Sequence, residues 1–234
     1  KVTRSNGRVM LRGPAGSGKE MAARYIYLNS NRVSGRFISI SCASIESDRM
    51  EEVLFGTEEG GLIKPGLLEQ ANNGVLFFDE VADMPKGTQS KILRVLIEQV
   101  FNRVGGVNKV RVDLRVLSST TKDLSEEIVK GNFREELYHR LNVVPITLPS
   151  LEERREDIEL LAQNFIKSLN ESEGLPIRTL SKEAIVGLQT LSWPGNIRQL
   201  KNTIERALIL GPLSGEIKAS EILQNEVDGR HNTQ

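Results

Sequence analysis

The chain has 234 residues, of which 31 are Lys or Arg and 31 are Asp or Glu, so its formal net charge is zero. A neutral chain has no net field that would draw it to nucleic acid or to a membrane surface. Its hydrophobic residues, 38% of the total, come in short bursts. None of these runs approaches the ~18 apolar residues of a membrane span.

The first predicted elements are a strand at Val9–Leu11, a glycine-rich loop and a helix through Met21–Ile26. Glycines let the loop backbone approach a phosphate without a Cβ clash, and the loop amides and helix N-terminus point their positive ends at the anion. A lysine adds a mobile charge for the β- and γ-phosphates. The candidate phosphate-binding residues are Gly13, Pro14, Ala15, Gly16, Ser17, Gly18, Lys19 and Glu20.

Glu20 departs from the general P-loop pattern, which places Ser or Thr after the lysine as a ligand of Mg²⁺. Taken alone, the octamer therefore leaves open a glycine-rich turn that binds nothing.

Short apolar runs recur between helical stretches and are rich in Val, Ile and Phe, which is typical of buried parallel strands. Helices between them, such as Thr88–Gln99 and Ser125–Lys130, would cover both faces. The fold class predicted is α/β, a doubly wound parallel sheet of five strands. The five runs are Val9–Leu11, Phe37–Ile40, Val75–Phe78, Leu114–Leu117 and Val143–Ile146.

After Pro149 the strand-like runs stop and helical periodicity takes over, at Glu156–Glu171, Ser181–Thr190 and Asn196–Leu210. Ser181 and Asn196 are suitable helix starts. This predicts a nucleotide-binding subdomain over residues 1–149, an all-helical lid over 150–226 and a polar tail over 227–234. Both ends of the chain are interpreted as cuts through a larger protein or as linkers.

A second chemical element is the apolar run Val75–Phe78 followed by Asp79 and Glu80. In an open α/β sheet, ligands bind at the carboxyl ends of the strands. Asp79 is suited to hold Mg²⁺, directly or through water, since hard cations take oxygen ligands. Glu80 is suited to orient and deprotonate the attacking water. The alternative is a strand that ends in a solvated acidic turn.

Several motifs now stand in register: Gly-x-x-Gly-x-Gly-Lys-Glu, Phe-Phe-Asp-Glu, the run Phe133–Val143, and Trp193–Leu200. Together they resemble the central AAA+ ATPase domain of NtrC-type activators of sigma-54 RNA polymerase, nearest to the NtrX branch. Glu follows the P-loop lysine in that family, so Glu20 agrees with it. The resemblance implies ATP or ADP as ligand, with Mg²⁺, and covers almost the whole chain.

The resemblance also implies roles for residues whose spacing alone says little. Arg134 and Arg140 would be arginine fingers that reach the γ-phosphate of a neighbouring subunit; otherwise they would be surface partners of Glu135 and Glu136. Arg198 matches the lid arginine that senses nucleotide. Thr120 and Thr121 follow the fourth strand, where a polar residue senses the γ-phosphate, and we assign Thr120 to this role. Trp193 is interpreted as lid core.

Two positions differ from the activators. They carry Gly-Ala-Phe-Thr-Gly-Ala on a mobile loop that grips the sigma factor, whereas the stretch Phe55–Leu67 is several residues shorter here and lacks Phe-Thr. Ser41 stands where activators usually place an Asn that couples the catalytic Glu to that loop. We therefore expect no contact with sigma-54 by the usual route, and a weakened or rerouted coupling.

The sequence thus predicts the ATP-binding central domain of a two-component transcriptional regulator, which acts in the cytoplasm and hydrolyses ATP slowly. Its partners would be copies of itself, from a dimer to a hexameric ring, with receiver and DNA-binding domains outside this chain. No membrane contact and no direct DNA contact are expected. One alternative is an assembly module that uses nucleotide occupancy with little or no hydrolysis. Another is a DNA remodeller such as a clamp-loader subunit, which the neutral charge disfavours.

Overall fold

The computed structural model describes residues 2–222. By its contacts the chain divides into two units: Lys1–Gly13 with Lys19–Leu148, and Pro14–Gly18 with Pro149–Gln234. The tail predicted over 227–234 lies outside the described residues. Within 2–222, no helix combines the length and apolar character needed to cross a bilayer.

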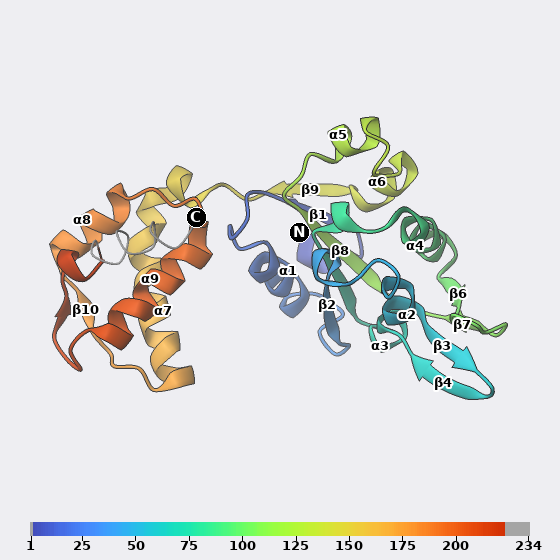
Figure 1. The fold of residues 1–234 in the computed structure, drawn as a ribbon, viewed down its shortest axis with the longest axis horizontal. Coiled ribbons are helices and arrows are strands. Elements are labelled where there is room, and N and C mark those ends of the chain that lie inside the picture. Colours follow the sequence, from blue (N-terminus) through green and yellow to red (C-terminus); the bar gives the residue numbers. More distant parts are fainter. Residues whose placement is uncertain (1, 223–234) are drawn as a thin grey trace. The chain divides into compact units, whose positions relative to one another are not determined.

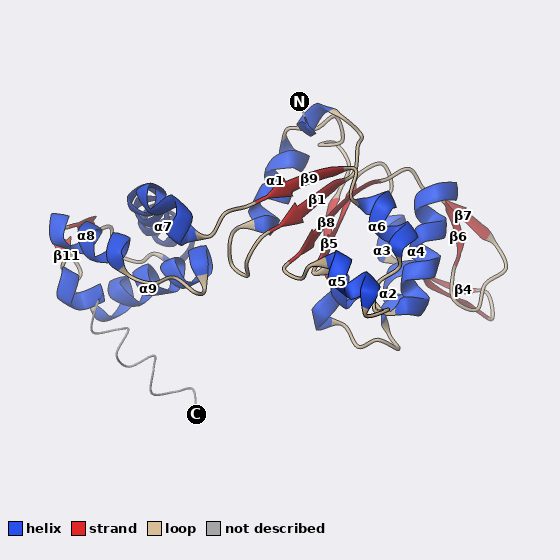
Figure 2. Cartoon of the chain, turned by 90° about the horizontal axis from the view of Figure 1, so that it is seen from above, coloured by secondary structure: helices blue, strands red, loops and turns tan. Residues whose placement is uncertain are grey.

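The first unit is built on five parallel strands in the order β2-β5-β8-β1-β9 (Figures 1 and 2). This confirms the predicted sheet, and every strand overlaps one of the five apolar runs. The strands are β1 (Val9–Arg12), β2 (Phe37–Ser41), β5 (Val75–Asp79), β8 (Arg115–Thr120) and β9 (Val144–Thr147).

Strand β8 extends three residues past the predicted Leu117, through Ser118, Ser119 and Thr120. These residues are polar, so an apolar-run criterion ends too early, yet all three are buried. Ser118 compensates by donating a hydrogen bond from its hydroxyl to the Val9 carbonyl (3.4 Å).

Side chains of the central strands alternate between two hydrophobic clusters, as the two-residue period of a strand requires. Val75 and Phe77 of β5 pack on the face covered by helix α1 (Lys19–Leu28). Leu76 and Phe78 face the larger cluster on the other side. Helices therefore cover both faces, as predicted. The remaining helices of this unit are α2 (Met50–Phe55), α3 (Leu67–Gln70), α4 (Lys86–Glu98), α5 (Leu124–Val129) and α6 (Glu135–Leu141).

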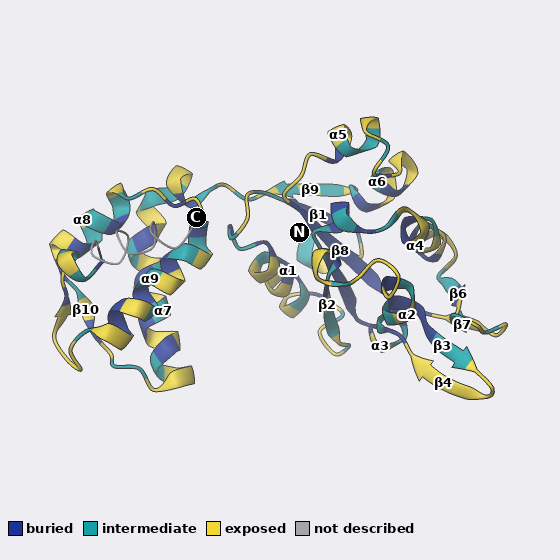
Figure 3. Ribbon diagram, in the orientation of Figure 1, coloured by how far each residue is buried: buried dark blue, intermediate teal, exposed yellow. Residues whose placement is uncertain are grey.

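Two antiparallel hairpins, absent from the predicted elements, extend from the same unit (Figure 1). One joins β3 (Gly56–Glu59) to β4 (Leu62–Pro65), and the other joins β6 (Val100–Asn102) to β7 (Lys109–Arg111). Every residue of β4 is exposed (Figure 3), so the hairpin carries no apolar alternation that would have revealed it. Short 3₁₀ turns complete the unit: η1 (Val2–Arg4), η2 (Cys42–Ser44) and η3 (Val81–Asp83).

The second unit is helical, with η4 (Leu151–Asp157), α7 (Ile158–Glu173), α8 (Lys182–Thr190) and α9 (Asn196–Leu210), and with one short parallel pair, β10 (Thr179–Leu180) and β11 (Glu216–Ile217). Helix α7 begins two residues later than predicted, because the chain through Asp157 forms the 3₁₀ turn η4.

The core of this unit contains one face of α9, with Leu200, Ile204 and Leu208 buried, in agreement with the helical periodicity predicted there. Trp193 is 1% exposed and its indole N–H donates to the Leu188 carbonyl (2.9 Å), which confirms its place in the lid core. The Ser181 hydroxyl accepts a hydrogen bond from the Ala184 amide and caps α8, as its position predicted.

Candidate functional site

The glycine-rich loop joins the end of β1 to the start of α1. Gly13, Gly16 and Gly18 have φ of 148°, 74° and 99°, so each adopts a backbone conformation that residues with a Cβ rarely reach. A Cβ at Gly16 would lie 2.3 Å from the Gly195 carbonyl oxygen. The loop therefore needs glycine at position 16 both for its backbone angles and for its close approach to a neighbouring segment.

The segment Pro14–Gly18 is held by three hydrogen bonds within the second unit. The Asn196 side chain donates to the Ala15 carbonyl (2.9 Å), the Ile197 amide donates to the Gly16 carbonyl (3.0 Å), and the Arg154 guanidinium donates to the Ser17 carbonyl (2.8 Å). Because these bonds occupy carbonyl oxygens, they leave the loop amides out of the contact. Arg198, the residue after Ile197, is exposed.

Two buried polar atoms beside this loop have no hydrogen-bond partner among the described residues: the Ser17 hydroxyl and the Arg154 Nε. Buried polar groups in native structures are almost always paired, so orphans of this kind indicate a missing ligand or water. Neither Arg154 nor Asn196 was predicted to contact the loop. Arg154 belongs to a charged run with the usual composition of a solvated surface, and only the three-dimensional structure brings it to the loop.

Lys19 is a buried cation of the first unit. Its residue is 6% exposed, and its ammonium donates to the Gly13 carbonyl (3.0 Å). The same nitrogen lies 3.5 Å from Glu80 Oε1, an ion-pair distance rather than a hydrogen bond. The predicted lysine and the predicted base therefore meet. Glu20, by contrast, is about half exposed and pairs with Arg24 one helical turn later (3.2 Å).

Asp79 and Glu80 lie at the carboxyl end of β5, beside the end of β8. The Asp79 carboxylate accepts a hydrogen bond from the Ser119 hydroxyl. Glu80 has φ 51° and ψ 56°, the left-handed region that is uncommon for residues other than glycine. Non-glycine residues persist in this conformation where the surroundings impose it, and such positions cluster at functional sites. The Ser119 hydroxyl accepts from the Glu80 amide (3.2 Å) and helps to hold this turn.

The Glu80 carboxylate is also held by Thr121. Its Oε2 accepts from the Thr121 amide (2.9 Å) and from the Thr121 hydroxyl (2.8 Å). Thr120, the residue we assigned, is 2% exposed, and its hydroxyl bonds to the backbone of Lys122 instead. In the described part of the chain it is thus Thr121 that reaches Glu80. Thr120 is the last residue of β8 and Thr121 follows it, so the two neighbouring threonines have different partners.

Ser41 makes no hydrogen bond to Glu80 within residues 2–222; its hydroxyl accepts from the Ser44 hydroxyl (2.9 Å). The serine side chain is shorter than that of the asparagine that NtrC-type activators usually carry at this position. Cys42, next along the chain, is 2% exposed, and burial together with Asp83, Asp79 and Glu80 raises the pKa of its thiol to about 12. A buried thiol with a raised pKa is poorly suited to act as a nucleophile.

Arg134 and Arg140 lie near the two ends of helix α6. Arg134 is its N-cap, and Arg140 belongs to its last turn. Both residues are exposed. Within residues 2–222 neither guanidinium forms an ion pair with Glu135 or Glu136; Glu135 lies 3.6 Å from His139 instead. The simple helix-surface pairing is therefore not formed, and both residues lie at the surface of their own unit.

The shortened loop is the β3–β4 hairpin. Its strands pair from Gly56 with Pro65 to Glu59 with Leu62, and Gly60 and Gly61, at φ 56° and 85°, form the two-residue turn. Arg103, from the second hairpin, bridges Glu58 (3.0 Å) and Glu69 (2.7 Å) at its base. The stretch is an ordered hairpin in this structure.

Comparison with known proteins identifies both units. The family described as the sigma-54 interaction domain matches residues 1–147, and the AAA+ ATPase lid domain matches residues 152–234. The nitrogen assimilation regulatory protein NtrX of Azorhizobium caulinodans is 50% identical over 224 residues, which cover 94% of this chain and 49% of that protein. The regulatory protein AtoC of Escherichia coli is 41% identical over 232 residues, or 97% and 50%.

Among solved structures, NtrX from Brucella abortus in complex with ATP superposes with a TM-score of 0.87 at 47% identity, covering 94% of this chain and 50% of that one. The chain spans about half the length of the relatives it matches. These matches agree with the five-stranded sheet, the helical second unit and the P-loop. The chain belongs to the sigma-54 interaction domain family of NtrC-type and NtrX-type regulators.

Proposed function

We propose that this chain is the ATP-binding and ATP-hydrolysing central domain of a two-component regulator, and that efficient hydrolysis requires contact between subunits. The observation that carries the proposal is the position of Lys19. Its buried ammonium lies between the Gly13 carbonyl and the Glu80 carboxylate, so the phosphate-binding cation and the candidate base face one another.

Two features of the loop suit a triphosphate: the backbone conformation of its glycines and a side-chain atom without a hydrogen-bond partner among residues 2–222. Its glycines have positive φ, a conformation in which loop amides can bind an anion, and the unpaired Ser17 hydroxyl offers a further donor. The related NtrX of Brucella abortus has been crystallised with ATP and with ADP. Arg198, exposed near the start of α9, would report occupancy from the lid.

The donor set also fits Mg²⁺. Within residues 2–222 there is no cluster of three or more metal-binding side chains. Mg²⁺ that accompanies a nucleotide needs no such cluster, since it usually takes one or two carboxylates, waters and substrate phosphates. Asp79 would hold it, with Ser119 fixing the carboxylate. When bound, the ion would neutralise charge on the phosphates.

Glu80 would act as the base. One carboxylate oxygen takes a proton from a water molecule as that water's oxygen forms a bond to the γ-phosphorus. The bond from phosphorus to the β,γ-bridging oxygen breaks, and ADP leaves with that electron pair. Before this, Lys19 must exchange its 3.5 Å contact with Glu80 for the phosphate, which frees Oε1 while Thr121 still holds Oε2.

Arg134 and Arg140 would serve a neighbouring subunit. Their exposure and their lack of ion pairs with the acids of α6 leave them available to an external phosphate. Such fingers neutralise charge in phosphoryl transfer and are worth ~10³–10⁵ in rate. We therefore propose that the active form is a dimer or a ring of up to six copies.

The test is the ATPase rate per subunit as a function of protein concentration. We expect the specific rate to rise as subunits associate, and Arg134→Ala to remove that rise while leaving ATP affinity unchanged. A rate independent of concentration in the unmodified chain would refute the role of the neighbour. Failure to bind ATP would refute the whole proposal.

A second candidate is an assembly module whose nucleotide sets the oligomeric state with little hydrolysis. The ordered β3–β4 hairpin favours it, because Gly60 and Gly61 occupy the tip and no Phe-Thr pair is present. We propose that this domain does not grip sigma-54 through that hairpin. Sedimentation with ATP and with ADP, beside phosphate release, separates the two: nucleotide-dependent association without turnover supports the module.

A further inference from the structure

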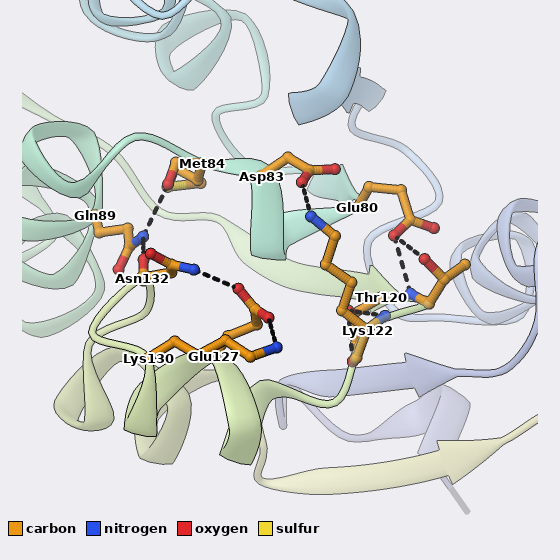
Figure 4. Close-up of polar contacts among 10 residues, drawn as sticks. Glu80, Asp83, Met84, Gln89, Thr120, Lys122, Glu127, Lys130 and Asn132 are labelled. Atoms are coloured by element: carbon orange, nitrogen blue, oxygen red, sulfur yellow. Dashed lines mark hydrogen bonds and ion pairs between the residues drawn. The ribbon is translucent and has the colours of Figure 1, made fainter.

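The side chain of Gln89, on helix α4, joins two parts of the first unit that carry different proposed roles. Gln89 is 0% exposed. Its amide nitrogen donates to the Met84 carbonyl (2.8 Å) and to the Asn132 carbonyl (2.9 Å), and its amide oxygen accepts from the Arg134 backbone amide (2.9 Å). Figure 4 shows Gln89 between Met84 and Asn132. Both donors and an acceptor site of the amide are thus in use.

The first of these parts is the turn that carries the base. Glu80 is followed directly by η3, and Met84 is the residue that ends η3. The Asp83 carboxylate in the same turn pairs with the Lys122 ammonium, next to the Thr121 that holds Glu80. A shift of this turn would therefore be felt at the Met84 carbonyl, to which Gln89 is bonded.

The second part is the segment that presents the proposed finger. Asn132 and Arg134 lead into α6, and Arg134 is its N-cap, with an extended backbone. The Asn132 side chain donates to Glu127 (2.9 Å), which fixes this segment to α5. The Arg134 Nε lies 3.4 Å from the Lys86 carbonyl at the start of α4. The Arg134 main chain is thus held by Gln89, while the residue itself stays exposed.

We propose that Gln89 is a positioning residue that ties the location of the Arg134 finger to the turn carrying Glu80 in the same subunit. The proposal rests on the trans-acting finger put forward above. Gln89 touches no reacting atom; it acts through Arg134, and so through the active site of the neighbouring copy. In this way a subunit's own site would influence how it serves its neighbour.

A glutamine is suited to this position because only an amide offers both two donors and an acceptor at this length. A Gln89→Glu variant would lose both donors and set a carboxylate against two carbonyl oxygens. Gln89→Met keeps the length and the burial but makes none of the three bonds. If Gln89 has only a structural role, either variant should lower the activity of the subunit that carries it, and an intact neighbouring copy should not restore that activity.

The experiment is subunit complementation on the full chain. Gln89→Met alone should lose about tenfold in kcat because its finger is misplaced, with ATP affinity changed by no more than about twofold. It is then mixed with Lys19→Ala, which cannot use its own site but has an intact Gln89 and an intact finger. In mixed assemblies the Lys19→Ala copies should supply fingers to the Gln89→Met sites and restore most of the lost rate.

Arg134→Ala mixed with Lys19→Ala is the matched reference. If Arg134→Ala is rescued and Gln89→Met is not, the Gln89 proposal is wrong while the trans finger stands. If neither is rescued, the trans finger itself is wrong, and Gln89 has no finger to position. Retention of the unmodified rate by Gln89→Met alone would also overturn the proposal.

Gln89→Glu is the second variant should Gln89→Met fail to fold. If both fail, hydrogen exchange of the unmodified chain decides. We expect the Arg134 amide, whose hydrogen Gln89 accepts, to change its exchange rate by about threefold or more when ATP is added, together with residues 81–84. An unchanged Arg134 amide beside a changed turn would overturn the coupling.

Discussion

Two buried cations lie at opposite ends of the parallel strands, one at the carboxyl ends and one at the amino ends, and they have different hydrogen-bond partners. Lys19 follows the carboxyl end of β1, and Arg115 begins β8 at the amino edge. The two residues are 6% and 2% exposed. The Lys19 ammonium has the Gly13 carbonyl at 3.0 Å and the Glu80 carboxylate at 3.5 Å. The Arg115 guanidinium donates to the Gly7, Thr3 and Val2 carbonyls at 3.0, 3.2 and 2.8 Å.

If the proposed function holds, the difference separates a cation that serves a ligand from one that serves the fold. The planar fork of Arg115 is directed at main-chain carbonyls of the N-terminal segment, and burial, then the nearby Arg32, lowers its pKa. Lys19 is a point charge on a flexible stem, 3.5 Å from Glu80, and in the proposed function this ammonium turns to the phosphate. The predictions below test this contrast, beginning with the largest expected effect.

Lys19→Ala should abolish useful nucleotide binding. It removes the positive charge at the start of the P-loop helix, and a hydrogen bond to a charged group is worth enough to weaken affinity by about 100-fold or more. Titration with a fluorescent ATP analogue measures this, with the melting temperature as a check on folding. Binding at the unmodified affinity would remove Lys19 from the site.

Glu80→Gln should bind ATP and fail to turn it over. The amide keeps the size of the side chain but cannot take the proton, and a positioned general base contributes about 10²–10⁴ in rate. Phosphate release and ATP affinity are measured on the same preparation. Release at the unmodified rate would refute the base assignment.

The contrast between the two cations also shows where sequence reasoning succeeds. The five strands and the P-loop were predictable because their patterns are local: apolar runs of strand length, and glycines next to a lysine. Arg115 gave no such signal, because its partners lie more than 100 residues away at Val2, Thr3 and Gly7. The same holds for Gln89 and Asn196, whose roles depend on pairings that only the folded chain creates.

Short elements were the other omission. Strands β3, β4, β6 and β7 have three or four residues each, too few for an alternating pattern to mark them. The left-handed backbone of Glu80 was equally hidden, since nothing in the sequence Phe-Phe-Asp-Glu distinguishes it from a continuing strand.

Arg115→Met should lower the free energy of unfolding by about 3 kcal/mol, because it removes three hydrogen bonds from the guanidinium to partly buried carbonyl groups. Removing a buried charge offsets part of this loss, which keeps the figure moderate. Urea denaturation measures the change, and ATP affinity of the folded fraction should stay within about twofold. Arg115→Lys is the control: it keeps the charge without the fork and should recover only part of the stability. If Arg115→Met is stable but no longer binds ATP, the assignment of Arg115 to the fold and of Lys19 to the ligand would be wrong.

The smallest effect concerns the two oxygens of Glu80, one exchangeable and one fixed. Oε1 faces Lys19, whereas Oε2 accepts two bonds from Thr121. Thr121→Val keeps the shape and the backbone bond but deletes the hydroxyl bond. We expect kcat to fall about tenfold with KM changed by no more than about twofold, since orientation of the base matters only as the reaction proceeds.

Thr121→Ser restores the hydroxyl and should restore the rate, while Ser41→Ala should change nothing, because the Ser41 hydroxyl bonds to Ser44 and not to Glu80. These two controls assign the effect to the oxygen on residue 121 rather than to packing. If Ser41→Ala slows turnover as much as Thr121→Val, the restraint on Glu80 lies with β2 after all. Glu80 would then be held during the reaction by a contact other than its hydrogen bonds to Thr121. The distinction between a fixed Oε2 and an exchangeable Oε1 would be wrong.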